Sequence, residues 1–210
     1  PVIGKCYSAT SKSNSHKMFI CSDPKYLPSN ENIMLQSFIP HYGQVGKIYV
    51  IGDDFCLKFR PSFYLPSSNF GLIQFDSQEM PKNFKLGTKD NHNSSLSFSA
   101  SLDLEAANIS NGQLCNLIDS VKKAVGLDLI GIDIIKSEVD KKWYVIDVNY
   151  FPGYNDFPDL KETFERFILC KLNGHVNKAD PKRDLKTKTK SNFGYAIYVV
   201  YFYVITVLII

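Results

Sequence analysis

The sequence predicts an α+β (mixed α/β) fold built on antiparallel sheet, with helices that flank it. Two pairs of strand-like runs, each separated by a short polar turn, indicate β-hairpins, whose strands are antiparallel. Two amphipathic segments indicate helices. Because strands and helices alternate unevenly, the order is not that of a Rossmann fold. The chain has 210 residues, of which 44% are hydrophobic, and this suits one or two domains with a packed core.

The first part of the chain contains mostly strands. Short apolar runs bounded by polar, Gly- or Pro-containing stretches are typical of strands and turns. The predicted elements are strands at 1–5 and 18–21 around a polar loop at 10–15, an apolar run at 34–39, and a hairpin with strands 47–51 and 55–60 around a turn at 52–54. Residues 66–101 are rich in Ser, Asn and Lys, so we expect mostly loop there, with a short strand at 73–75.

The second part contains both predicted helices. Ser110 has the character of an N-cap, and Gly126 occupies the place of a C-cap. Between them, one helical face is apolar, at Leu114, Leu117, Ile118, Val121 and Val125. A second hairpin is expected from 129–135 and 143–148 around a turn at 138–141, followed by a helix at about 159–172.

The net charge of +3 at pH 7 is unevenly distributed. Residues 178–190 contain six Lys or Arg and two Asp, so the rest of the chain is close to neutral. A basic tail does not indicate a nucleic-acid-binding body, and we expect no nucleic-acid partner. The five cysteines are never three residues apart, which argues against a disulfide framework and against a CxxC site. We therefore expect a reducing, cytoplasmic environment.

The C-terminal end differs from the rest of the chain. Residues 191–210 carry no charged side chain, and 194–210 are almost wholly apolar. A membrane span needs roughly 20 apolar residues, and the lysines before this segment would lie on the cytosolic side. Two other interpretations stay open: a segment that is not native coding sequence, and a core strand or helix, which the length disfavours.

Polar residues inside two apolar strands form the most informative chemical pattern. Asp133 interrupts Gly-Ile-Asp-Ile-Ile, and Asp147 and Asn149 interrupt Val-Ile-Asp-Val-Asn-Tyr. A carboxylate on a buried strand is costly unless a cation or a donor meets it. Asp147 and Asn149 face the same side of a strand, and hairpin pairing would let Asp133 join them. Two carboxylates and an amide oxygen suit Mg²⁺, although buried salt bridges or turn caps would also explain the aspartates.

Several motifs, taken in order, resemble those of a known family. They are Pro1–Lys5, Asn14–Met18, Gln36–His41 followed by Lys47–Gly52, Arg60–Ser62, Asp133, Asp147–Asn149 and Phe151–Tyr154. On these residues the chain is similar, from 1 to about 172, to the inositol-tetrakisphosphate 1-kinase (inositol 1,3,4-trisphosphate 5/6-kinase) family of the ATP-grasp superfamily. A lone Asp-x-Asn is a weak signal, whereas ordered motifs are specific.

The resemblance implies a fold and a reaction. The fold would be the central and C-terminal subdomains of ATP-grasp, with antiparallel sheet and flanking helices. The reaction would be Mg²⁺-dependent transfer of the ATP γ-phosphate to a hydroxyl of an inositol tris- or tetrakisphosphate. ATP and Mg²⁺ would be the cofactors and the inositol polyphosphate the partner of a monomer, with a membrane involved only if the C-terminal tail is genuine.

The same resemblance assigns roles to residues. ATP would be bound by Lys5, Gln36, Ser37, Phe38, Ile39, Lys47, Ser62 and Ser77. The inositol substrate would be bound by His16, Lys47, Asn149 and Gly153. The metal would be held by Asp133, Asp147 and Asn149. His16, Lys47 and Arg60 would act in catalysis, Arg60 beside the transferring phosphate.

Plainer interpretations stand beside these roles. Lys5 could be an exposed strand-end lysine, His16 a loop histidine without function, and Arg60 a partner in a rim salt bridge. A rival enzyme is an ATP-grasp ligase joining a carboxylate to an amine, which would not need His16 and Lys47 as phosphate ligands. A non-catalytic protein that binds nucleotide or inositol phosphate is the other rival. The sequence shows no obvious dedicated base.

Two departures from the family pattern matter. Where the family has a glycine before its Ser-His loop, residues 10–13 contain none and hold one extra residue, so reduced activity is expected unless Lys12 compensates with its charge. The family also has an N-terminal domain before the strand that carries Lys5, so the chain is expected to begin within the central domain. The expected organisation is a kinase region at 1–172, a basic linker at 173–190 and the apolar tail at 191–210.

Overall fold

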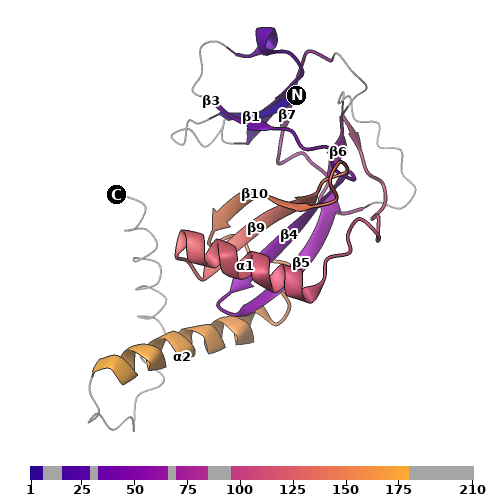
Figure 1. The fold of residues 1–210 in the computed structure, drawn as a ribbon. Helices are drawn as coiled ribbons and strands as arrows, with labels where there is room; N and C mark the ends of the chain where they lie inside the picture. Colours follow the sequence, from indigo (N-terminus) through magenta and orange to yellow (C-terminus); the bar gives the residue numbers. More distant parts are fainter. Residues whose placement is uncertain (7–15, 29–32, 66–69, 85–95, 180–210) are drawn as a thin grey trace. The chain divides into compact units, whose positions relative to one another are not determined.

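The computed structural model describes residues 1–6, 16–28, 33–65, 70–84 and 96–179 (Figure 1). The chain divides into two compact units, Pro1–Asn155 and Asp156–Ile210. The first holds all the described strands and helix α1 (Asn111–Val125), and the second holds helix α2 (Leu160–Ala179). The predicted loop at 10–15 with its missing glycine, most of the basic linker and the apolar tail lie outside the described residues.

The first sheet is antiparallel, with the strand order β3–β1–β2–β7. Its strands are β1 (Val2–Cys6), β2 (Lys17–Cys21), β3 (Ile33–Ser37) and β7 (Leu72–Asp76). Each falls on a predicted apolar run, but β3 ends at Ser37. The last two residues of the apolar run at 34–39, Phe38 and Ile39, therefore lie in the connection that follows β3.

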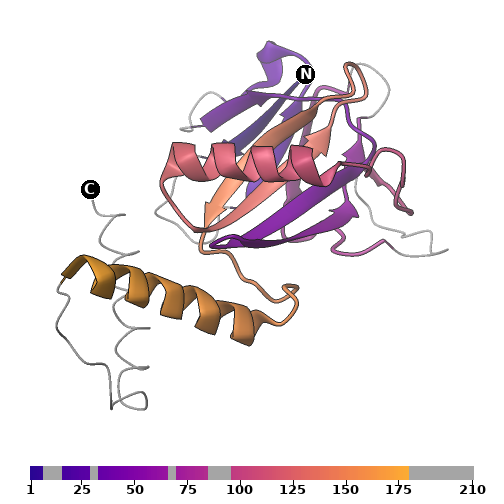
Figure 2. The same ribbon diagram turned by 60° about the horizontal axis from the view of Figure 1, so that its bottom comes forward.

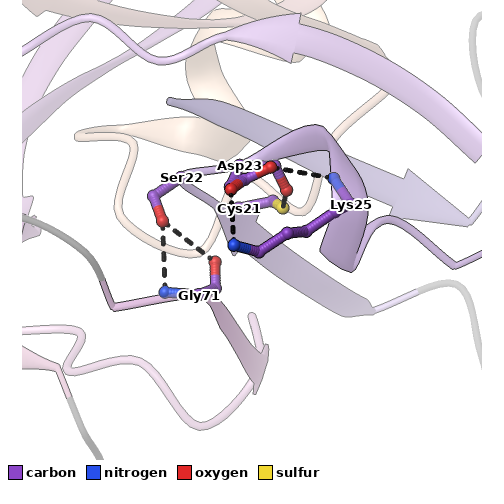
Figure 3. Close-up of polar contacts among 5 residues, drawn as sticks. All are labelled: Cys21, Ser22, Asp23, Lys25 and Gly71. Atoms are coloured by element: carbon purple, nitrogen blue, oxygen red, sulfur yellow. Dashed lines mark hydrogen bonds and ion pairs between the residues drawn. The ribbon is translucent and has the colours of Figure 1, made fainter.

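Side-chain bonds hold the outer end of this sheet together (Figure 3). The backbone N–H of Ser22 donates to the Gly71 carbonyl at 2.9 Å, and the Gly71 N–H donates to the Ser22 hydroxyl at 3.1 Å. Asp23 then caps a short 3-10 helix, Pro24–Tyr26, by accepting from the Lys25 backbone N–H at 3.0 Å. These two bonds between Ser22 and Gly71 join residues 49 positions apart and hold β7 beside β2.

The second sheet is also antiparallel, with the order β10–β9–β4–β5. Its strands are β4 (Gln44–Ile51), β5 (Asp54–Pro61), β9 (Leu129–Lys136) and β10 (Trp143–Tyr150). Both predicted hairpins are confirmed, with longer strands than expected. Ile51 pairs with Asp54, so the first turn has two residues and Asp54 belongs to β5; Gly52 takes the φ of 65° that this tight turn requires.

Helix α1 covers one face of the second sheet (Figures 1 and 2). Ser110 and Gln113 form a capping box at its start, and Gly126 ends it with φ 70°, as the cap residues predict. Leu114 and Ile118 pack into a core with alternate residues of β4 and β9, namely Ile48, Val50, Ile130, Ile132 and Ile134. The intervening residues of these strands therefore face the opposite side of the sheet.

Two features were not predicted. Strands β6 (Phe63–Tyr64) and β8 (Ser97–Phe98) form a small pair, although 66–101 was expected to be mostly loop. Helix α2 ends at Ala179 and not at about 172.

Among the described helices, none combines the length and apolarity that crossing a membrane requires.

Candidate functional site

The predicted metal residues lie in one row across the second sheet. Lys47 of β4 is directly opposite Asp133 of β9, and Asp133 is directly opposite Asp147 of β10. Directly opposed residues point to the same face, and this is the face that α1 leaves uncovered. Sheet pairing thus lines up one cation and two carboxylates.

A β-bulge makes this alignment possible. Trp143 pairs with Lys136 and Val145 with Ile134, so an unbroken ladder would place Asp147 opposite Ile132, on the face that α1 covers. The register shifts between Val145 and Asp147, and the extra residue turns Asp147 to the open face. Asn149, two residues further, faces the same way.

Asp133 is the less exposed of the two carboxylates in the row. Its side chain is 21% exposed, and the Lys47 ammonium lies 3.2 Å from Oδ1 and 3.5 Å from Oδ2. Burial raises the pKa of the Asp133 carboxyl, Lys47 opposes the rise and neighbouring Asp147 adds to it. Oδ1 is buried and, among the described residues, receives no hydrogen bond of good geometry. The ion pair with Lys47 at 3.2 Å only partly compensates for the missing hydrogen bond. Oδ1 of Asp133 is therefore a buried oxygen that can bind a cation.

The first sheet contributes a second cation. Lys5 of β1 places its ammonium 3.5 Å from Oδ1 of Asp147, with side-chain exposures of 28% and 41%. Asn149 donates its amide N–H to the other oxygen of Asp147 at 3.0 Å, which leaves the amide oxygen of Asn149 for another ligand. No three His, Cys, Asp or Glu side chains of the described residues form a metal cluster, so the oxygen set here is two carboxylates and an amide.

A cavity of about 570 Å³ opens over this row, within the first compact unit. This is the size of a small-molecule site. Every residue predicted for the site except Gly153 lines the cavity, namely Lys5, His16, Gln36, Ser37, Phe38, Ile39, Lys47, Arg60, Ser62, Ser77, Asp133, Asp147 and Asn149. Gly153 is exposed, and no atom of the described residues lies within 4 Å of the position where a Cβ would stand.

Backbone pairing brings two of the predicted residues together. The Ser77 N–H donates to the His16 carbonyl at 2.8 Å, which extends the β2–β7 ladder by one step. On the opposite wall, Nη2 of Arg60 donates to the Tyr49 hydroxyl at 2.9 Å. The two walls therefore hold their polar side chains on regular strands or at strand ends.

The loop after β10 is held against the second sheet. Gly131 has no side chain, and an added Cβ would stand 3.1 Å from the Pro152 ring. Phe151 takes a left-handed φ of 40°, and its N–H donates to the Leu129 carbonyl at 2.9 Å. Buried Tyr154 donates its hydroxyl to the Val50 carbonyl at 2.9 Å, and burial raises the pKa of this phenol.

Sequence reasoning named no role for one buried histidine of the cavity wall. His41 is 7% exposed, and its two ring nitrogens lie 2.8 Å from the Ile39 carbonyl and 2.8 Å from the Ser62 hydroxyl. The only available signal was its place at the end of the Gln36–His41 motif. Met80, Pro81 and Lys82 also line the cavity and were assigned no role.

Comparisons with known proteins show which family the chain resembles. Inositol-tetrakisphosphate 1-kinase 1 of Arabidopsis thaliana is 29% identical over 172 residues, which is 80% of this chain and 53% of that protein. The inositol-tetrakisphosphate 1-kinases of Danio rerio (29%, 78% of this chain, 40% of that protein) and Xenopus laevis (32%, 70% and 36%) are similar too. The chain thus spans about half the length, or less, of the curated relatives it matches.

One solved structure shows a weak likeness. A Chryseobacterium gregarium RiPP-associated ATP-grasp ligase, in complex with ADP and a leader and core peptide, is 14% identical, and the match covers 89% of this chain and 51% of that one. Its TM-score of 0.34 is too low to support an argument. The family model described as the inositol 1,3,4-trisphosphate 5/6-kinase ATP-grasp domain matches residues 1–170, and the chain therefore belongs to that ATP-grasp family.

Proposed function

We propose that this chain is the nucleotide- and metal-binding part of an inositol polyphosphate kinase. The reaction transfers the γ-phosphate of ATP to a hydroxyl of an inositol tris- or tetrakisphosphate. One observation supports this beyond family membership: two carboxylates, one amide and two lysines meet at and beside the row of Lys47, Asp133 and Asp147. A site that binds a metal together with phosphate groups needs both kinds of side chain.

Asp133, Asp147 and Asn149 fit a bound Mg²⁺. Their oxygens are hard ligands, and Mg²⁺ commonly takes one or two carboxylates and completes its shell with phosphate and water. The buried Asp133 oxygen without a well-formed hydrogen bond is the feature that fits a cation best. When bound, the metal would reduce the negative charge of the phosphates.

Lys5, Lys47, Arg60 and His16 are proposed to bind phosphate groups from the two walls of the cavity. Lysine acts as a point charge on phosphate, whereas arginine can bind two oxygens at once. Lys5 and Lys47 already lie within ion-pair distance of Asp147 and Asp133, so phosphates bound to them would be close to the metal ligands.

In the proposed transfer, a substrate hydroxyl oxygen forms a bond to the γ-phosphorus as the bond to the β–γ bridging oxygen breaks. ADP leaves with the electrons of that bond, and the hydroxyl proton is lost to solvent or phosphate. Little covalent work falls to the protein, so positioning and charge stabilisation by the cavity residues account for the rate.

The test is Mg²⁺-dependent phosphorylation of inositol 1,3,4-trisphosphate from γ-labelled ATP by the whole chain, alongside Mg²⁺-dependent ADP binding by calorimetry. Asp147→Asn should reduce both strongly. Asp119→Asn, an exposed position on α1, is the matched control and should change neither. Equal ADP binding by wild type and Asp147→Asn would refute the metal assignment. ADP binding without phosphate transfer would indicate a binding protein, or a need for regions of the relatives that the match does not cover.

A further inference from the structure

His41 connects the segment between β3 and β4 to Ser62, the residue that follows β5. One ring nitrogen, Nδ1, lies 2.8 Å from the Ile39 carbonyl, and the other, Nε2, lies 2.8 Å from the Ser62 hydroxyl. Both residues are almost wholly buried, His41 at 7% and Ser62 at 6% exposure. The rings of Phe38 and Phe63 stand 5.5 and 6.3 Å from the imidazole, so this wall of the cavity is apolar around a single polar pair.

The partners fix where the protons are. A carbonyl can only accept, so Nδ1 must carry a hydrogen and donate to Ile39. Burial lowers the pKa of the His41 imidazole, against the weaker effects of the Ile39 hydrogen bond and the nearby Glu138 charge, so the ring is neutral at neutral pH. A neutral ring with its hydrogen on Nδ1 has only a lone pair on Nε2. The Ser62 hydroxyl therefore donates its one hydrogen to Nε2.

This leaves Ser62 with acceptor capacity alone toward the cavity that it lines. Phosphate oxygens are also acceptors, so this hydroxyl cannot bind them. A ligand group that meets it has to carry an N–H or O–H. Phe38 and Ile39, which precede His41, are among the residues that the family resemblance assigns to ATP, and an apolar wall suits the base of a nucleotide better than its phosphates. We therefore place the Ser62 hydroxyl at the base end of the site.

We propose that His41 is a positioning residue that makes Ser62 an obligate acceptor, and that Ser62 thereby selects a purine with a 6-amino donor over one with a 6-oxo acceptor. This rests on the proposed function, because it assumes that the cavity binds a nucleotide. Under this proposal the pair of His41 and Ser62 contributes to adenine recognition, and the buried histidine acts by orienting the Ser62 hydroxyl.

The experiment measures binding of ADP and of inosine diphosphate, with Mg²⁺ at pH 7.5, to the whole chain. With inosine diphosphate, the Ser62 hydroxyl oxygen and the 6-oxo oxygen of the base are both acceptors, so neither is paired. Wild type should therefore prefer ADP by about tenfold to hundredfold. In His41→Phe the Ser62 hydroxyl has no acceptor at Nε2 and can rotate to donate, so the preference should fall to within about threefold. His41→Gln, which offers an amide oxygen to Ser62, should keep most of the preference.

Ser62→Ala provides a second route if His41→Phe does not fold, as thermal unfolding would show. It should weaken ADP binding and leave inosine diphosphate binding unchanged. A merely structural role predicts that both affinities fall together at constant ratio, and that result overturns the inference. So does a wild type that binds ADP without preferring it. Failure of wild type to bind either nucleotide overturns the proposed function as well, which separates the two failures.

Discussion

Protonation of His41 should make the fold less stable in mild acid. The imidazole is 7% exposed and is held neutral by burial, whereas in the unfolded chain it titrates near pH 6.5. Below that pH, His41 binds a proton in the unfolded chain but not in the folded chain. The free energy of unfolding contributed by this group is therefore fully present above about pH 6.5 and is lost as the pH falls.

One proton sets the size of the effect. A histidine that stays neutral in the folded state lowers the free energy of unfolding by at most about 1.4 kcal/mol between pH 7.5 and pH 5.5. Asp133 acts in the opposite direction, because its raised pKa makes the folded state hold a proton more firmly than the unfolded state in weak acid. The effect of His41 therefore has to be read as a difference between variants.

Urea unfolding of wild type and His41→Gln, measured at both pH values, isolates the contribution of His41 to the pH dependence of the free energy of unfolding. Wild type should lose about 1 kcal/mol more than the variant, because only wild type gains the extra proton on unfolding. Ser62→Ala is the control, since it removes the hydrogen bond and keeps the titrating ring, so its pH dependence should resemble that of wild type. Equal pH dependence in wild type and His41→Gln would refute the neutral, buried ring and the proton placement built on it.

Three further changes test other parts of the structure. Gly4→Ala should reduce the free energy of unfolding by about 1–3 kcal/mol, because the new Cβ would overlap the buried Phe19 ring, and chemical denaturation would measure it. Tyr154→Phe should cost about 1 kcal/mol through the lost hydrogen bond to Val50. Mg²⁺ and ADP at a hundred times their dissociation constant should stabilise wild type by about 2.7 kcal/mol, and Asp133→Asn much less.

Controls and contrary results follow from the same positions. Gly112→Ala is a matched control for the first change, since a Cβ there meets no atom of the described part of the chain within 4 Å, and α1 should gain up to about 1 kcal/mol. A Gly4→Ala protein as stable as wild type would contradict the packing against Phe19. An undiminished melting temperature in Tyr154→Phe would show that the bond to Val50 contributes nothing. Equal stabilisation of wild type and Asp133→Asn by Mg²⁺ and ADP would contradict the proposed metal site.

Local patterns predicted most of the fold. The capping residues Ser110 and Gly126 marked α1, because they satisfy the ends of a helix whichever tertiary structure surrounds it. Both hairpins followed from apolar runs around short turns. The pair β6–β8 was missed, because two-residue strands in a Ser-rich stretch carry no periodicity.

The site was harder to predict in two places. Alternation along β10 cannot show that Asp147 faces Asp133, because the bulge that reverses the alternation depends on packing against β9. The contact of His41 with Ser62 joins residues 21 positions apart across the end of β5, and no spacing rule gives such a pair. Resemblance to a family indicated the cavity residues, but it could not give the proton arrangement between them.

The two ion pairs on the cavity floor have a consequence for how ligands enter. Lys5 with Asp147, and Lys47 with Asp133, are each other's counter-ions in the free protein. A cation that bound alone to the two carboxylates would leave both ammonium groups without partners. A phosphate that bound alone to the two ammonium groups would leave both carboxylates without partners. A ligand that brings both charges at once would exchange every partner and leave none of the four groups unpaired, so under the proposed function metal and phosphate would bind together.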